Sequence, residues 1–249
     1  MPDRRKSADI WTAAKSAARA VPGLSRVVRW AMPLFEPASR ASAWLLRKQP
    51  HRLYQPGGRT ALDRHPELFS ALRDGLADLP RPRILSFGCS TGEEILTLRS
   101  YIPHAELAGI DINRHRLRQA RRKAHDRSIR FLVAGSIGET DAGTFDAITC
   151  LNVLHRSQTL HQWPADPTPY LSFAAFERAV LDLDRALRPG GILVLDFMSF
   201  NFTETAVAKN YAAIVTTVRL GEPVKRYDRN NQPILLPPGE QASLWRKLS

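Results

Sequence analysis

The sequence has few cysteines and no long apolar segment. Cys89 and Cys150 are the only cysteines among 249 residues, which excludes a disulfide framework. No apolar run approaches the roughly 20 residues that a membrane-spanning helix needs. The basic N-terminus also lacks the apolar stretch and cleavage site of a secretory signal. We therefore expect a protein of the reducing cytoplasm, with the two cysteines at the ends of neighbouring strands as a buried thiol pair.

Acidic residues are outnumbered by basic ones, and the excess is uneven along the chain. The net charge is +12, and residues 1–50 contribute +7 of it through ten Lys and Arg against three acids. Residues 81–200 hold 15 basic and 13 acidic residues, so the middle of the chain is nearly neutral. This charge favours nucleic acid, an anionic membrane or an acidic partner. A nucleic-acid enzyme would more often carry the charge around its active cleft.

The basic leader also contains Trp, Val and Leu residues, and prolines divide it into short helical stretches. The simplest interpretation is a helical cap that packs on the main domain. The alternative is a basic amphipathic segment that contacts a membrane or a partner. We expect a leader over residues 1–64 and a main domain over residues 65–249.

Short apolar runs alternate with amphipathic segments from residue 83 onward. This order predicts a parallel sheet with helices on both of its faces. Two later segments, 212–220 and 243–248, are expected to add an antiparallel pair, with a loop over 228–239 between them. The predicted fold is α/β, with a Rossmann-like, mostly parallel sheet of seven strands and an N-terminal helical cap. The other expected strands are 84–87, 106–111, 129–133, 145–150 and 192–197, and the helices are 65–79, 93–101, 113–125 and 170–187.

A glycine-bounded turn, Gly88-Cys89-Ser90-Thr91-Gly92, lies between the first strand and the following helix. Gly88 and Gly92 permit a tight turn and the close approach of a ligand to the backbone. The free N–H groups that begin the helix can meet a carboxylate or another polar group. Asp111 ends the next strand, where a carboxylate suits the two hydroxyls of a ribose. Together these features predict a nucleotide-type site.

The same turn distinguishes between nucleotides. A dinucleotide fingerprint requires three glycines in the pattern Gly-x-Gly-x-x-Gly. Here Ser90 stands at the middle position, and Glu93 and Glu94 occupy the region of the third glycine. Two carboxylates are poor neighbours for a pyrophosphate but suit an amino group. The pattern therefore favours S-adenosylmethionine over NAD.

Residues 81–200 resemble the class I S-adenosylmethionine-dependent methyltransferases in four segments: 88–94, 109–113, 145–155 and 187–191. The first of these segments, with residues 150–154, is most similar to the chemotaxis-receptor glutamate methyltransferases. Ile95-Leu96 departs from the Pro-Tyr of those enzymes, and a receptor-docking insertion is not evident. Methylation of receptor glutamates is therefore not inferred.

The resemblance implies a role for several side chains. Glu93 or Glu94 would bind the ammonium of the cofactor, Asp111 the ribose, and Asn152 the cofactor near its reactive end. No metal is expected. The cofactor site that the resemblance implies comprises Gly88, Cys89, Ser90, Gly92, Glu93, Glu94, Asp111, Ile112, Ser136, Asn152 and Val153.

His155 follows the fourth strand and is the candidate catalytic residue. With an ordinary pKa near 6.5, an imidazole suits general-base catalysis. The alternative is a loop histidine without a role. Methyl transfer from a sulfonium needs little more than an aligned, deprotonated nucleophile in a water-poor pocket, so a base is not obligatory.

The favoured function is S-adenosylmethionine-dependent methyl transfer to a small molecule or specialised metabolite. The alternatives are an RNA or protein methyltransferase, which only the charge supports, and a non-catalytic S-adenosylmethionine-binding module. A run of cations between residues 114 and 127 could form a nucleic-acid patch. Leu117, Ala120 and Ala124 supply a narrow inner face, so we interpret these cations as a solvated face. Peripheral contact with an anionic membrane through the leader is a further expectation.

Overall fold

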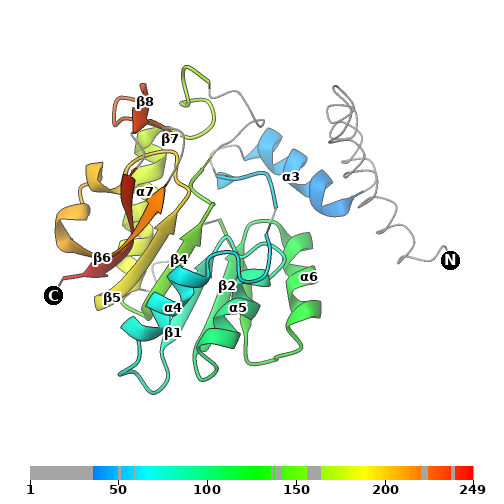
Figure 1. Ribbon diagram of the computed structural model, residues 1–249. Helices are drawn as coiled ribbons and strands as arrows, with labels where there is room; N and C mark the ends of the chain where they lie inside the picture. The colour runs from blue at the N-terminus through cyan, green and yellow to red at the C-terminus, as the bar shows by residue number, and fades with distance from the viewer. Residues whose placement is uncertain are drawn as a thin grey trace.

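A computed structural model describes residues 36–49, 52–58, 60–135, 137, 142–155, 164–219, 224–236 and 239–248 (Figure 1). Strands and helices alternate through the middle of the chain, as the sequence predicts. The helices are α3 (Pro37–Lys48), α4 (Pro66–Gly75), α5 (Glu93–Tyr101), α6 (Arg114–Ala124) and α7 (Phe173–Ala186). The strands are β1 (Arg83–Phe87), β2 (Glu106–Asp111), β3 (Arg130–Val133), β4 (Phe145–Leu151), β5 (Leu187–Asp196), β6 (Tyr211–Arg219), β7 (Val224–Tyr227), β8 (Pro233–Leu236) and β9 (Gly239–Lys247).

The main sheet has seven strands in the order β3-β2-β1-β4-β5-β9-β6. Strands β1 to β5 pair in parallel, whereas β9 is antiparallel to both β5 and β6. The predicted fold class and the predicted antiparallel pair are therefore confirmed. The strand order reverses between β1 and β4, which are neighbours in the sheet and are followed by connections to its opposite sides.

Helices cover both faces of this sheet and bury two apolar clusters. On one face, α4, α5 and α6 pack residues such as Leu72, Leu98 and Leu117 against the strands. On the other face, α7 contributes Phe176 and Leu183 to a larger cluster. Figure 1 shows α7 behind the sheet and α4 in front of it. Burial on both faces explains why the parallel strands read as nearly continuous apolar runs.

Two boundaries differ from the sequence prediction. Helix α7 begins at Phe173 rather than 170, because Ser172 caps it and its Oγ accepts the Ala175 N–H at 3.2 Å. The strand expected over 192–197 begins earlier, at Leu187, and the β4–β5 register shifts between residues 187 and 192. A positive φ of 75° at Gly190 accommodates the irregularity.

The expected loop over 228–239 is wrong in part, because β7 and β8 form a separate two-stranded sheet. Asp228 closes the hairpin, since its Oδ1 accepts the N–H groups of Asn230 and Gln232, each at 2.8 Å. Side chains of this kind stabilise turns by substituting for backbone acceptors.

Helix α3 packs on the N-terminal end of α6, as a cap would. The Asn113 side chain donates to the Ala38 carbonyl at 2.8 Å and to Ser42 Oγ at 3.0 Å. The Arg116 guanidinium donates to Ser42 Oγ at 3.1 Å and to the Pro56 carbonyl at 2.6 Å. Residues 1–35 of the leader lie outside the described residues. Within the described part of the chain, no helix is long and apolar enough to cross a membrane.

The two cysteines do not form the expected pair. Both are free and buried, but Cys89 belongs to the cluster under α5 and Cys150 to the cluster under α7. Burial raises the pKa of both thiols. Adjacent strands can therefore end in cysteines whose side chains lie in separate parts of the core.

Candidate functional site

The carboxyl ends of β1, β4 and β5 are marked by backbone strain. Ser90, Asn152 and Phe197 adopt positive φ values of 50°, 57° and 51°. Such values are uncommon outside glycine, and residues with this strain cluster at functional sites. Ligands of open α/β sheets bind at the carboxyl ends of the strands, where the strand order reverses. This edge, between β1 and β4, is therefore the candidate site.

The glycine turn closes on the neighbouring strand and on the β4 connection. The N–H groups of Gly88 and Cys89 both donate to the Ile110 carbonyl, at 2.8 and 3.0 Å. Gly88 has a φ of 77°, and a Cβ there would lie 2.5 Å from Val153 Cγ2. A side chain at position 88 is therefore excluded by both φ and space, and Val153 packs directly on the turn.

Gly92 has the positive φ that a tight turn requires, and it also lies against α6. Its φ is 93°, and a Cβ would lie 2.9 Å from the Ala120 Cβ of α6. Position 92 therefore accommodates the close packing of α6, and the approach of a ligand to its backbone stays a prediction. The Cys89 side chain likewise points into the sheet, because its Sγ would contact a Cβ at Gly109 at 2.8 Å.

Asp111 ends β2 beside the glycine turn and is 7% exposed. Its Oδ2 accepts the Ser90 N–H at 3.0 Å, and its Oδ1 accepts the Asn113 N–H at 2.7 Å. Burial raises the pKa of the carboxyl, and these hydrogen bonds with the nearby Arg116 cation oppose the shift. Each carboxylate oxygen retains a lone pair for a ligand hydroxyl.

Glu94 lies between β1 and β4, at the reversal of strand order. Its Oε1 accepts hydrogen bonds from Ser86 Oγ, at 2.8 Å, and from Thr149 Oγ1. Burial raises the pKa of this carboxyl, and the two hydroxyls partly counter the shift. The carboxylate is thus fixed through one oxygen, while Oε2 has no hydrogen bond within the described residues. A buried carboxylate of this kind is stabilised by a cation.

Glu93 has a different environment from its neighbour. Its Oε1 accepts from Lys123 of α6, and its Oε2 accepts from Thr91 Oγ1 at 2.6 Å. The hydrogen bonds from Lys123 and Thr91 lower the pKa of Glu93 in spite of its partial burial. The sequence left both glutamates open as ammonium ligands, whereas among the described residues Glu94 alone of the two has a carboxylate oxygen without a hydrogen-bond partner.

The loop formed by residues 55–58, which precedes α4, packs against the glycine turn. Ser90 Oγ donates to the Gly58 carbonyl at 3.2 Å. Arg116 holds the same loop, through the carbonyls of Pro56 and Gly57 at 2.6 and 3.2 Å. Arg116 is 8% exposed, so this member of the basic run is a structural residue and not part of a solvated face. The structure adds this loop to the site.

The remaining predicted residues surround the same edge. Ile112 is partly exposed after β2, and its Cδ1 would contact a Cβ at Gly135 at 3.0 Å. Asn152 donates its backbone N–H to the Asp196 carbonyl at 3.0 Å, and its side chain has no hydrogen bond within the described residues. Ser136 lies outside the described residues.

His155 lies in a setting that changes its expected chemistry. Its Nδ1 is 3.4 Å from Ser199 Oγ. Burial, with the cation of Arg226, lowers its pKa to about 4. The expected pKa near 6.5 is therefore wrong. His155 is neutral at pH 7, but its low basicity makes it a poor proton acceptor.

A second histidine at this edge was not found from the sequence. His65 Nδ1 lies 3.9 Å from Asp196 Oδ2, and the imidazole contacts the Phe197 ring at a centroid distance of 5.8 Å. Asp196 is the last residue of β5, just as Asp111 is the last residue of β2. An aspartate near the end of a predicted strand is therefore a pattern in the sequence that could have identified Asp196. His65 lies before α4, and no local pattern connects it with β5.

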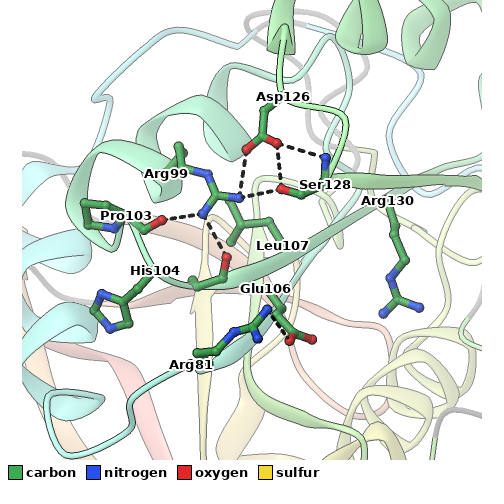
Figure 2. Close-up of a pocket in the computed structure, with 10 residues that line it drawn as sticks. Arg81, Arg99, Pro103, His104, Glu106, Leu107, Asp126, Ser128 and Arg130 are labelled. Carbon is green, nitrogen blue, oxygen red and sulfur yellow. Dashed lines mark hydrogen bonds and ion pairs between the residues drawn. The ribbon is translucent and has the colours of Figure 1, made fainter.

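A hollow at the opposite edge of the sheet does not belong to this site. It has a volume of about 470 Å³ and lies by the amino ends of β2 and β3 (Figure 2). Figure 2 shows Arg99 bound to Asp126, Ser128 and two carbonyls, and Arg81 bound to Glu106. Both cations are already paired with carboxylates, and the hollow is at the wrong end of the strands for the ligand of a parallel sheet.

Comparison with known proteins bears on this site. Residues 85–193 match the family model for a methyltransferase domain (Methyltransf_12). Demethylmenaquinone methyltransferase of Thermus thermophilus is 34% identical over 119 residues, which are 46% of this chain and 47% of the relative. The chain thus spans about half the length of this curated relative.

Solved structures with a similar arrangement include the YcgJ protein of Bacillus subtilis. It is 14% identical with a TM-score of 0.45, covering 74% of this chain and 100% of its own. The N-methyltransferase NodS of Bradyrhizobium japonicum is 18% identical with a TM-score of 0.46, covering 76% and 100%. Residues 85–193, which match the methyltransferase-domain model, thus lie in a mostly parallel sheet of seven strands, as predicted from the sequence.

Proposed function

We propose that this chain transfers the methyl group of S-adenosylmethionine to a small-molecule acceptor. One observation carries the proposal. Two buried carboxylates, Asp111 and Glu94, flank the glycine turn where the strand order reverses, and hydrogen bonds within the protein fix the position of each. Asp111 would accept from the ribose hydroxyls, and Glu94 Oε2 would bind the ammonium. NAD has no ammonium group that could donate a charge-assisted hydrogen bond to Glu94.

The residues present fit this cofactor. Asp111 and Glu94 have oxygens for two hydroxyls and one ammonium, and Asn152, which precedes the Val153 that packs on Gly88, has an amide with donors and an acceptor. When bound, the cofactor supplies an electrophilic methyl group on a sulfonium. Ile112 would contact the adenine, and Val153 would exclude water from the turn. The Cys89 side chain points into the sheet, and the space beside the Cα of Gly92 is filled by Ala120. Only the backbone at these two positions would therefore line the site.

The protein's contribution to the chemical step is alignment and the removal of water. His155, with a pKa of about 4, would remain neutral and position the acceptor, with little capacity to take its proton. An acceptor that is already ionised, or an uncharged nitrogen or sulfur, fits this environment. The His65–Asp196 pair lies at the same edge and is a second candidate for contact with the acceptor.

The name of the Thermus relative, demethylmenaquinone methyltransferase, supports a small-molecule acceptor. Only the net charge of the chain would support methylation of RNA or protein. The resemblance of residues 88–94 to the chemotaxis-receptor glutamate methyltransferases supports the proposed binding of the cofactor and does not extend to the acceptor. The division into a leader over residues 1–64 and a catalytic domain over residues 65–249 belongs to the same proposal, as does action in the cytoplasm.

Calorimetry with S-adenosylhomocysteine and with NAD tests the cofactor. We expect S-adenosylhomocysteine to bind and NAD not to bind. Asp111→Ala should weaken binding about 10- to 150-fold, which corresponds to roughly 1.5–3 kcal/mol for charge-assisted hydrogen bonds. Asp146→Ala is the matched control: Asp146 is also 7% exposed and accepts a backbone N–H, from Arg83 at 2.6 Å, but it lies at the amino edge of the sheet.

Asp146→Ala should lower stability and leave the affinity of the folded protein within about twofold. Preferential binding of NAD, or equal affinity losses in the two variants, would overturn the assignment. Release of S-adenosylhomocysteine during turnover separates an enzyme from a binding module.

A further inference from the structure

The outward sides of α3 and of the beginning of α6 form one strongly basic surface with an exposed tryptophan. Trp44 is 55% exposed, and the surrounding cations are also exposed. We name this surface the α3–α6 basic face and define it by Arg40, Trp44, Arg47, Lys48, Arg114 and Arg118.

Helix geometry explains why the α3 residues share a side. Positions 40, 44, 47 and 48 are separated by three or four residues and therefore project from the same side of a helix. The opposite side is buried through Ala38, Ser42 and Leu45. On α6, Arg114 and Arg118 are four residues apart, and both are exposed.

The two helices are joined directly beneath this surface. Asn113 donates to the Ala38 carbonyl at 2.8 Å, and Arg116 donates to Ser42 Oγ at 3.1 Å. The pKa of His115 is lowered, mainly by burial and to a smaller extent by the cations of Arg114, Arg118 and Arg40. Cations of both helices therefore lie close enough to affect this imidazole, so they act on a common region.

The charge of this face is not neutralised from within the two helices. Neither α3 nor α6 contains an acidic residue. Three of the other four cations of α6 are bound elsewhere, and the fourth is Arg122: Arg116 is bound to the loop before α4, Arg121 to the Phe131 carbonyl and Lys123 to Glu93. No ion pair is recorded for the five cations of the face within the described residues.

We propose that the α3–α6 basic face docks the protein on the surface of an anionic lipid bilayer. Tryptophan is favoured at the level of the lipid headgroups, and Lys and Arg around it bind the negative leaflet. The outward sides of two adjacent helices can lie against an extended surface such as a bilayer. Proteins that bind a nucleic-acid strand usually do so in a positively charged groove. The inference goes beyond methyl transfer and does not require it.

Docking here has a consequence for the site. Asn113, which holds α3, is two residues from Asp111, so the docked surface adjoins the edge of the sheet where the candidate site lies. An acceptor carried in the bilayer would then meet the protein at its ligand-binding edge.

Co-sedimentation of the full chain with vesicles tests the proposal. Vesicles of phosphatidylcholine with about 30% phosphatidylserine should bind the protein, and pure phosphatidylcholine vesicles should not. Binding should be lost in about 0.5 M NaCl, which screens exposed charges. Arg40→Gln/Arg47→Gln/Lys48→Gln should lower the partition coefficient roughly 100-fold, because each cation near an anionic surface contributes about fivefold. Trp44→Ser should lower it by about tenfold.

The matched control removes the same charge elsewhere, in Arg73→Gln/Arg81→Gln/Lys209→Gln, whose three cations are exposed on other parts of the surface. This variant should bind vesicles within about threefold of the unmodified chain. Equal losses in both triple variants, or no loss in the α3 variant, would overturn the proposal, as would binding of RNA in place of vesicles. All variants should retain their affinity for S-adenosylhomocysteine, and failure of the unmodified chain to bind that compound would count against the proposed function alone.

Discussion

Glu94→Gln separates the charge of the site from its geometry. An amide oxygen can still accept the hydrogen bonds that Ser86 and Thr149 donate to Glu94 Oε1, so the side chain can keep its position. The variant replaces Oε2, the oxygen that the proposed function assigns to the ammonium of the cofactor, with an NH₂ group. Loss of affinity can then be attributed to the missing charge.

The expected magnitude follows from the two states of the site. In the complex, a charge-assisted hydrogen bond of roughly 1.5–3 kcal/mol is lost, which corresponds to about 10- to 150-fold in affinity. In the free protein the effect has the opposite sign. Burial raises the pKa of Glu94, so the charged form costs folding free energy at pH 7. Removing that charge should leave the melting temperature equal or higher.

Calorimetric titration with S-adenosylhomocysteine, together with thermal unfolding of the free protein, measures both quantities. The pH dependence adds a third readout. As the pH falls through the raised pKa of Glu94, the unmodified protein should lose affinity and Glu94→Gln should not. Stability should respond in the other direction, since the penalty for a raised carboxyl pKa appears as the pH rises above 4.5 and through the folded value.

Glu93→Gln is the matched control. It removes a neighbouring carboxylate that is bound to Lys123 and Thr91, so affinity should remain within about twofold while stability falls by about 0–1 kcal/mol. Unchanged affinity in Glu94→Gln would refute the assignment of the ammonium. So would a larger affinity loss in Glu93→Gln than in Glu94→Gln.

Three further predictions concern other parts of the structure. Gly92→Ala should lower the free energy of unfolding by about 1–3 kcal/mol more than Gly143→Ala, in denaturant titrations, because both positions have positive φ but only Gly92 faces Ala120; equal losses would contradict the packing argument. His155→Gln should abolish a loss of up to about 3 kcal/mol of stability as the pH falls from 6.5 to 4, because the depressed pKa disfavours protonation in the folded state; an unchanged pH profile would show that the imidazole is not shielded. Ser42→Ala removes the acceptor for two buried donors and should increase proteolysis within α3, measured by mass spectrometry, with unchanged cleavage rates refuting that attachment.

The sequence predicted the sheet well because its signals are local. Apolar runs and the glycine turn located β1, β2 and β4, and Asp111 could be placed at a strand end from its position alone. The antiparallel pair was also found, although β9 begins at Gly239 rather than 243. Boundaries near residue 190 failed because the tertiary pairing of β5 with β4 extends a strand through Pro189.

The chemistry of individual side chains depended on distant residues. Glu93 and Glu94 are equivalent in the sequence, and only the position of Lys123 and Thr149 distinguishes them. The pKa of His155 depends on Arg226, which belongs to β7, a strand that was not expected from the sequence. His65 meets Asp196 only after α4 has packed across the sheet. These pairs carry no local pattern.

The most direct test of the central claim follows a labelled methyl group. The full chain is incubated with methyl-labelled S-adenosylmethionine and a cell extract that has been separated into small-molecule, RNA and protein fractions. We expect label in a compound of the small-molecule fraction, with release of an equal amount of S-adenosylhomocysteine, and a strongly reduced rate for Glu94→Gln at limiting cofactor. Label confined to RNA or protein, or no transfer to any fraction in spite of cofactor binding, would contradict the account.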